Sequence, residues 1–283
     1  MKTLITGAAG KLGRTIADHL HHSGFDVLGA DLSYTKDVEW KLVVANLLQR
    51  EAVYDLLQGV DTIVHLANHP NANFGTAQQV YIENVSMDMN LFQAALECGV
   101  KRIIFSSSIQ VTSSSWPFSS QYQLEPPAAL PVDHTLPHRP ANPYALSKQA
   151  GEDMLSYFVR LGLPTGISVR FPFVHSNRHS WVSRYLKRAW TDNRNEFHSF
   201  LDIRDAATLT EHLLKADLAG YHVFFPVAST PGRGVDPEAV RQEFFPDVPL
   251  RGVTPPLSSL VDCSELERLT GWKPQYGWEE FPD

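Results

Sequence analysis

Up to Arg170, short apolar runs alternate with longer segments in which apolar residues recur at the helical period. The apolar runs predict strands buried on both faces, at residues 4–6, 27–30, 42–45, 62–66 and 102–105. The segments between them predict helices, at residues 12–22, 50–57 and 78–98. A further helix is expected from Pro143, followed by a sixth strand at 166–170. This alternation is typical of an α/β fold with a doubly wound parallel sheet of Rossmann type.

The regular pattern is interrupted twice. Residues 113–143 are rich in Ser, Pro and Gln, which predicts a long surface loop that either covers the substrate or decorates the surface. After Arg170 the alternation fades, although 201–214 still predicts a helix and 222–227 a strand.

These shifts divide the expected fold into two parts. The first is a Rossmann domain of residues 1–170, to which 200–228 returns. The second is a small C-terminal substrate-binding domain made of residues 171–199 and 229–283.

Composition narrows the function classes. Hydrophobic residues make up 43% of the chain and charged residues 19%, as in ordinary globular enzymes. The 24 Lys and Arg residues against 31 Asp and Glu leave a net charge of −7, which argues against nucleic acid or an anionic membrane as partner. No apolar stretch is long enough to span a membrane. Cys98 and Cys263 form no disulfide framework and no secretory signal precedes the first strand, so we expect a cytoplasmic protein.

A glycine-rich turn follows the first predicted strand. Gly7, Gly10 and Gly13 stand where the strand gives way to a helix. There one glycine permits a tight turn, one lets backbone N–H groups approach a pyrophosphate, and one lets helix and strand pack closely. The alternative is a glycine-rich loop without a ligand, but its place after the first strand favours nucleotide binding.

Asp31 ends the second predicted strand, close to the spacing of about 20 residues at which an acid meets the adenosine ribose. A carboxylate there accepts hydrogen bonds from the ribose hydroxyls and repels a 2′-phosphate, which favours NAD over NADP. The alternative is a turn residue, because Leu32 and Ser33 also suit a turn.

A Tyr and a Lys stand four residues apart at the start of a predicted helix. Tyr144 and Lys148 therefore share one helix face. An ammonium beside the phenol lowers the Tyr pKa from about 10 toward neutrality and makes the Tyr a usable acid or base. The pair alone occurs by chance on many helices. The serines at 106–108 add to it, because a hydroxyl at the end of the fifth strand can hydrogen-bond the reacting oxygen, although a polar strand end is the alternative.

Together these motifs resemble the extended short-chain dehydrogenase/reductase family, in its NAD-dependent epimerase/dehydratase branch. The resemblance covers nearly the whole chain, at residues 6–13, 64–67, 84–85, 99–102, 106–108, 143–148, 169–172, 205–207 and 271–274. It implies that Tyr144 is the catalytic acid/base, that Lys148 tunes it and holds the nicotinamide ribose, and that Ser108, rather than Ser107, orients the substrate hydroxyl. It also implies homodimers formed through a bundle of the helices at 78–98 and 144–158.

The resemblance further implies two sets of binding residues. The NAD set is Gly7, Ala9, Gly10, Lys11, Leu12, Gly13, Asp31, Asn46, Leu47, Leu66, Ala67, Asn84, Ser106, Tyr144, Lys148 and Phe171. The substrate set is Asn68, Ser108, Ile109, Gln110, Tyr144, His175, Arg178 and Arg194. No metal site is expected, because neither His65 with His69 nor His134 with His138 falls on a convincing helix.

Departures from the family bear on the substrate. Nucleotide-sugar members usually carry an Arg that binds the diphosphate where this chain has His198, and dehydratases carry an acid pair where it has Ile109 and Gln110. A dehydratase is therefore disfavoured. We expect an NAD-dependent oxidoreductase or epimerase that acts on a hydroxyl carbon of a sugar or nucleotide sugar. The alternatives are a dehydrogenase of a free sugar or sugar acid, similar to uronate dehydrogenases, and an NAD-binding regulator without turnover.

Overall fold

Seven parallel strands form the central sheet of the computed structural model, which describes residues 1–112, 125–175 and 196–278. Their order is β3-β2-β1-β4-β5-β6-β9, and each neighbouring pair is parallel. The strands are β1 (Lys2–Thr6), β2 (Asp26–Asp31), β3 (Lys41–Val44), β4 (Thr62–His65), β5 (Arg102–Ser108), β6 (Thr165–Phe171) and β9 (Gly220–Phe224). The predicted doubly wound α/β fold is confirmed.

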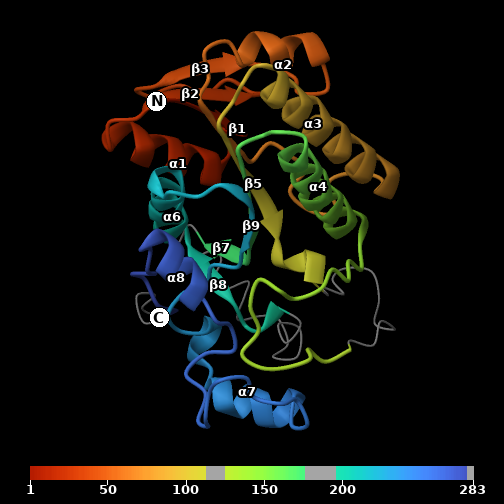
Figure 1. Cartoon of the computed structure of the whole chain (residues 1–283), viewed down its shortest axis with the longest axis vertical. Coiled ribbons are helices and arrows are strands. Elements are labelled where there is room, and N and C mark those ends of the chain that lie inside the picture. The colour runs from red at the N-terminus through yellow and green to blue at the C-terminus, as the bar shows by residue number, and fades with distance from the viewer. Residues whose placement is uncertain (113–124, 176–195, 279–283) are drawn as a thin grey trace.

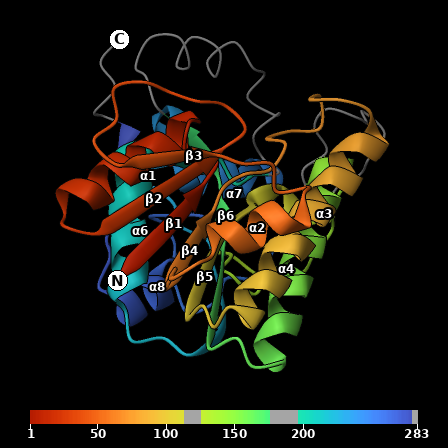
Figure 2. The same cartoon turned by 90° about the horizontal axis from the view of Figure 1, so that it is seen from above.

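Helices cover both faces of this sheet (Figures 1 and 2). One face carries α1 (Lys11–His22), α6 (Ile203–Lys215) and α8 (Ser264–Thr270), and the other carries α2 (Arg50–Leu56), α3 (Ala77–Glu97) and α4 (Pro143–Arg160). Successive residues of a strand point to opposite faces, so Leu4 packs under α3 while Ile5 packs under α1 and α6. Burial on both sides explains why the strands are continuous apolar runs in the sequence.

A smaller core lies beyond the carboxyl ends of the strands. Here β7 (Phe173–His175) pairs with β8 (Phe200–Asp202), and α7 (Pro237–Phe244) lies at the far end of the molecule (Figure 1). The short helical turns η1 (Ile109–Thr112) and η3 (Gly232–Gly234) complete the elements of the described ranges. The predicted division into two domains stays a prediction.

Two expectations for this region are corrected. Part of the predicted surface loop is core, because Leu130 and Val132 are 0% and 2% exposed and bridge to Leu250 and Val261. Residues 113–124 of that loop lie outside the described ranges. The helix predicted from residue 201 begins at Ile203 instead, because Asp202 caps it by accepting a hydrogen bond from the Arg204 N–H.

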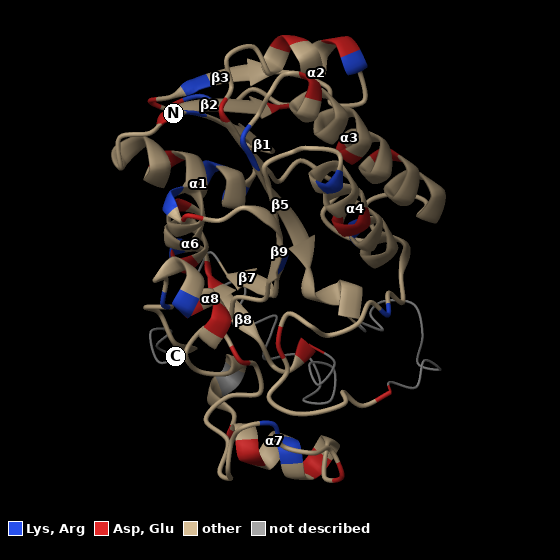
Figure 3. Cartoon of the chain, in the orientation of Figure 1, with Lys and Arg blue, Asp and Glu red and all other residues tan. Residues whose placement is uncertain are grey.

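Acidic and basic residues are both present on the outer helices, including α7 (Figure 3). No helix within the described residues is long and apolar enough to cross a membrane.

Candidate functional site

A cavity of about 1020 Å³ opens where the strands end at their carboxyl side. It lies over β1 and β4, between which the strand order reverses, and this is where open α/β sheets bind ligands. Its size is at the upper end of the roughly 300–1,000 Å³ usual for ligand sites.

The glycine turn forms one wall of this cavity and could not hold other residues. Gly7 has φ +69°, and a Cβ on it would lie 2.9 Å from the backbone carbon of Leu66. A Cβ on Gly13 would lie 2.1 Å from the carbonyl oxygen of Gly7. Gly10 caps α1 without a side chain that could fill the anion-binding end of the helix. Glycines that keep the turn tight, at the N-terminal end of a helix that lines the cavity, fit the pyrophosphate of a dinucleotide.

Asp31 lies at the next part of the cavity, at the end of β2. Its carboxylate accepts hydrogen bonds from the backbone N–H groups of Ala9 and Ser33, both at 3.0 Å. The residue therefore shapes a turn and lines the cavity as well, so the two interpretations of Asp31 are not exclusive. Asn46 and Leu47 line the same side, and Asn46 accepts a hydrogen bond from the Leu48 N–H at 3.0 Å.

Tyr144, Lys148 and Ser108 meet at the opposite end of the cavity. The cap Asn142, which accepts a hydrogen bond from the Ala145 N–H, and Pro143 start α4, so Tyr144 lies in its first turn and Lys148 one turn later. The Ser108 hydroxyl is hydrogen-bonded to that of Tyr144. The geometry thus favours Ser108 over Ser107 as the residue beside Tyr144.

The neighbouring hydroxyl is engaged elsewhere, because Ser107 donates to the buried carboxylate of Glu152. Lys148 Nζ donates to Asn68 Oδ1 at 2.6 Å and to the Ser106 carbonyl at 2.7 Å. Two of the three ammonium hydrogens are therefore directed by the protein, and the fixed ammonium lies 5.7 Å from the centre of the Tyr144 ring.

The pKa values of this pair differ from the sequence-based expectation. Burial raises the pKa of Tyr144 to about 12, which the Ser108 hydrogen bond opposes and the charge of Glu196 reinforces. Burial lowers the pKa of Lys148 to about 8, and the negative charge of Asp88 opposes this shift. The prediction that Lys148 brings the Tyr144 pKa toward neutrality is wrong for the protein alone, because burial is the largest cause of the shift and Lys148 is not among its causes.

Most of the remaining sequence-based site residues line the cavity: Ala9, Lys11, Leu12, Leu66, Ala67, Asn68, Ser106, Ile109, Gln110 and Phe171. Asn68 was expected to bind substrate, yet its amide group already accepts from Lys148 and donates to Asp88. The Gln110 side chain accepts from Asn142 at 3.0 Å.

Two predicted site residues do not line the cavity, and two lie outside the described residues. Asn84 is fully buried behind the cavity, where it accepts from the His69 N–H at 2.7 Å and donates to Ser147 at 2.9 Å, so it positions the wall and does not form part of it. His175 is 2% exposed at the end of β7 and does not line the cavity, although Phe173 and Val174 of the same strand do; burial lowers its pKa while Asp202 opposes the shift. Arg178 and Arg194 lie outside the described residues.

Sequence reasoning missed a set of lining residues contributed mostly by segments that follow strands: Leu32, Ser33, Ala45, Leu48, His69, Pro70, Asn71, Phe74, Glu83, Met87, Pro172, Phe173, Val174 and Glu196. The loop after β4 could have been found, because the carboxyl end of every strand near the switch point is a candidate. Glu83 and Glu196 had no such signal. In this loop His69 stacks on Phe74 with ring centres 4.3 Å apart and pairs with Glu83.

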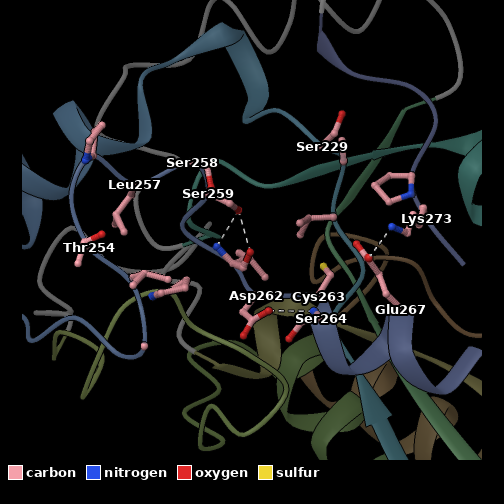
Figure 4. Close-up of a pocket in the computed structure, with 18 residues that line it drawn as sticks. Ser229, Thr254, Leu257, Ser258, Ser259, Asp262, Cys263, Ser264, Glu267 and Lys273 are labelled. Atoms are coloured by element: carbon pink, nitrogen blue, oxygen red, sulfur yellow. Dashed lines mark hydrogen bonds and ion pairs between the residues drawn. The ribbon is translucent and has the colours of Figure 1, made fainter. Parts of the chain in front are cut away.

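A second cavity, of about 1090 Å³, lies among the C-terminal segments (Figure 4). Its charged side chains are already engaged, since Lys273 pairs with Glu267 at 3.3 Å and Asp262 accepts from the Ser264 N–H at 2.8 Å. None of the predicted site residues lines it. Over the described part of the chain, no group of three His, Cys, Asp or Glu residues could hold a metal ion. The chemistry therefore centres on the first cavity.

Known proteins give the context for this geometry. Uronate dehydrogenase from Pseudomonas syringae pv. tomato is 31% identical over 203 residues, which are 66% of this chain and 69% of that protein. UDP-glucose 4-epimerase from Mycolicibacterium smegmatis is 30% identical over 174 residues, 57% of this chain and 52% of that protein. A solved short-chain dehydrogenase/reductase superfamily protein from Agrobacterium tumefaciens with bound NAD has a TM-score of 0.74 at 21% identity, covering 99% of this chain and 94% of that one.

A sequence profile of the NAD dependent epimerase/dehydratase family matches residues 3–221. The predictions of an extended short-chain dehydrogenase/reductase, of an enzyme with oxidoreductase or epimerase chemistry, and of NAD as cofactor are confirmed. With a match over more than half of its residues, the chain belongs to the NAD dependent epimerase/dehydratase family.

Proposed function

We propose that this enzyme is a dehydrogenase that oxidises a hydroxyl carbon of a free sugar or sugar acid and releases NADH. The observation that carries the proposal is His198, which stands where nucleotide-sugar members of the family carry an Arg for the diphosphate. It is 0% exposed and does not line the cavity, so this position offers no cation to a nucleotide sugar. The similarity to a uronate dehydrogenase supports the same choice.

The residues of the site suit this reaction. Ser108 would orient the substrate hydroxyl, and Tyr144 as phenolate would accept its proton while the carbon loses a hydride. When bound, NAD supplies the hydride acceptor and, on its oxidised ring, a positive charge that favours a nearby phenolate. Lys148 adds a second fixed positive charge and has one ammonium hydrogen left for a ribose hydroxyl.

The test is NADH absorbance while the purified protein and NAD meet a panel of free sugars, sugar acids and nucleotide sugars, with Tyr144→Phe beside it. Steady NADH release with a free sugar or sugar acid, lost in the variant, supports the proposal. Isomer exchange in a nucleotide sugar without net NADH would overturn it in favour of an epimerase. Tight NAD binding with neither outcome would point to a regulator without turnover.

The proposal includes a homodimer formed through α3 and α4, which pack side by side. Large apolar side chains are exposed on both helices, among them Ile82 on α3 and Tyr157 on α4. A second copy would cover these side chains in a four-helix bundle. Sedimentation would detect the dimer, and Ile82→Lys should weaken it.

We also propose that the protein is cytoplasmic, where the free thiols of Cys98 and Cys263 would stay reduced.

A further inference from the structure

A buried chain of hydrogen bonds runs beneath the cavity and ends at Lys148. It begins at Thr6 on β1 and passes through His65 on β4, Asp88 on α3 and Asn68 after β4. Asp88 is 0% exposed, which is costly for a carboxylate unless a donor or a cation compensates it. The carboxylate of Asp88 therefore requires a hydrogen-bond donor or a cation inside the protein.

The hydrogen bonds around His65 fix its protonation. Thr6 Oγ1 accepts hydrogen bonds from the backbone nitrogens of Leu66 at 3.1 Å and Ala67 at 3.2 Å. The Leu66 N–H also donates to the backbone carbonyl of Thr6. The hydroxyl hydrogen of Thr6 must then point to His65 Nδ1, 2.7 Å away. His65 is thus neutral, with its one ring hydrogen on Nε2, which donates to Asp88 Oδ1 at 2.9 Å. A neutral imidazole supplies a donor to Asp88 but no charge.

Asn68 links Asp88 to the nearest buried cation. Its orientation is dictated by its partners, because an ammonium only donates and a carboxylate only accepts. Asn68 Oδ1 accordingly faces Lys148 Nζ at 2.6 Å, and Asn68 Nδ2 faces Asp88 Oδ1 at 3.0 Å. One amide side chain therefore separates a buried negative charge from a buried positive one.

The second carboxylate oxygen of Asp88 faces the helix that carries Tyr144 and Lys148. Among the described residues Asp88 Oδ2 has no hydrogen-bond partner, and a Cβ on Gly151 of α4 would lie 2.8 Å from it. Glycine at this position lets α4 approach the carboxylate. Asp88 is 0% exposed and forms no ion pair with a Lys or Arg of the described residues, so its charge is little screened by bulk solvent and acts on Lys148.

Other ionisable groups surround the pair on the elements packed against it. In the described ranges these include Tyr144 and Glu152 on α4, His69 after β4, Glu83 on α3, Arg170 on β6, Tyr221 on β9, and Glu196. His69 pairs with Glu83, and Arg170 pairs with Glu152. Asp88 is the acid that is linked to Lys148 through a hydrogen-bonded side chain.

We propose that Asp88 is a positioning residue that acts through Asn68 to keep the Lys148 ammonium charged and fixed beside Tyr144. A buried Lys readily loses its proton, and a neutral amine would no longer favour the Tyr144 phenolate. The charge of Asp88 also makes Asn68 a directed acceptor and not a free substrate ligand. The proposal rests on the proposed catalytic site but not on the identity of the substrate.

The test is a pH titration of the whole protein labelled isotopically at lysine Cε, read by nuclear magnetic resonance. The Lys148 signal is assigned by its loss in Lys148→Met. In the wild type we expect Lys148 to titrate near its pKa of about 8. Asp88→Asn keeps an oxygen for His65 and Asn68 but removes the charge, so the midpoint should fall by about one pH unit. Asp153→Asn removes a charge from the exposed side of α4 and is the matched control, with no shift expected.

A second variant separates charge from structure. In the Asp88→Asn background, Asn68→Asp exchanges the amide and the carboxylate: the new carboxylate accepts from the ammonium and from the amide at position 88, so it should restore the midpoint. An unchanged midpoint in Asp88→Asn would mean that Asp88 is a neutral acid, and no restoration in the double variant would mean that position 68 does not join the two groups. Either result overturns the proposal. Neither titration needs turnover, so failure of the proposed function would be seen separately, in the absence of NADH release.

Discussion

Removal of the charge of Glu152 is expected to destabilise the protein strongly at neutral pH. This carboxylate is buried between α4 and β6, where it accepts from Arg170 Nε at 3.0 Å and Nη2 at 2.9 Å. His138 Nε2 lies 2.7 Å away and Ser107 donates as well. The Glu152 and Arg170 side chains are 2% and 5% exposed, so Glu152→Gln leaves a buried guanidinium without its counter-charge.

The magnitude follows from the Glu152 pKa. Burial alone would raise this pKa, but hydrogen bonds from His138 and Arg170 and the charge of Arg170 lower it from 4.5 to about 2. A fall of about 2.5 units at about 1.4 kcal/mol per unit gives about 3.5 kcal/mol of stability at neutral pH. Because the pKa is lower in the folded state, this contribution is complete above about pH 5 and is lost as the pH falls toward 2.

Denaturant unfolding followed by tryptophan fluorescence measures this contribution. At pH 7 the free energy of unfolding of Glu152→Gln should be about 3.5 kcal/mol below that of the wild type, and the difference should narrow by roughly half by about pH 3. Glu265→Gln is the matched control, because Glu265 is 45% exposed in its pairs with His134 and Arg268 and should cost at most about 0.5 kcal/mol. A loss below about 1 kcal/mol at pH 7, or a difference that does not change with pH, would refute the reasoning.

Three further variants test the cavity. Gly13→Ala would place a Cβ 2.1 Å from the Gly7 carbonyl oxygen, so NAD affinity measured by calorimetry should fall at least about tenfold, and retained affinity would contradict this account of the turn. Asp31→Asn removes the charge that we expect to repel a 2′-phosphate, so the ratio of NADP to NAD affinity in fluorescence titrations should rise; a constant ratio would mean that Asp31 does not determine the choice of cofactor. Tyr144→Phe should reduce NADH release about 10²–10⁴-fold at unchanged NAD affinity, and wild-type rates would exclude Tyr144 as the base.

The parts of the site that the sequence predicted are those whose physical cause is local. A tight turn that needs Gly7 and Gly13 is written in adjacent residues, and a shared helix face for Tyr144 and Lys148 follows from a spacing of four. Buried parallel strands can be predicted from the sequence for the same reason, because each is an apolar run bounded by residues close to it in the chain. Such features need no knowledge of what packs against them.

The parts that sequence reasoning missed depend on partners distant along the chain. Leu130 and Val132 looked like loop residues between prolines, and only their bridges to Leu250 and Val261 make them core. The Tyr144 pKa was expected in the wrong direction because the helix spacing reveals the nearby Lys but not the extent of burial. Desolvation is a sum over the whole surrounding structure and leaves no local pattern.

The hydrogen bonds that link Asp88 to Lys148 through Asn68 depend both on local strand register and on packing between elements distant along the sequence. Within its own helix Asp88 resembles any polar residue of an amphipathic α3, and His65 is one of 12 histidines in the chain. The register of β1 and β4 places Thr6 beside His65. The packing of α3 against these strands then brings Asp88 within hydrogen-bonding distance of His65. No sequence motif reveals that Asp88 is separated from the proposed catalytic Lys148 by the side chain of Asn68 alone. The proposal therefore predicts that a family member with the same Tyr and Lys but without an acid at this position of α3 works at a different pH, because its ammonium lacks the buried counter-charge.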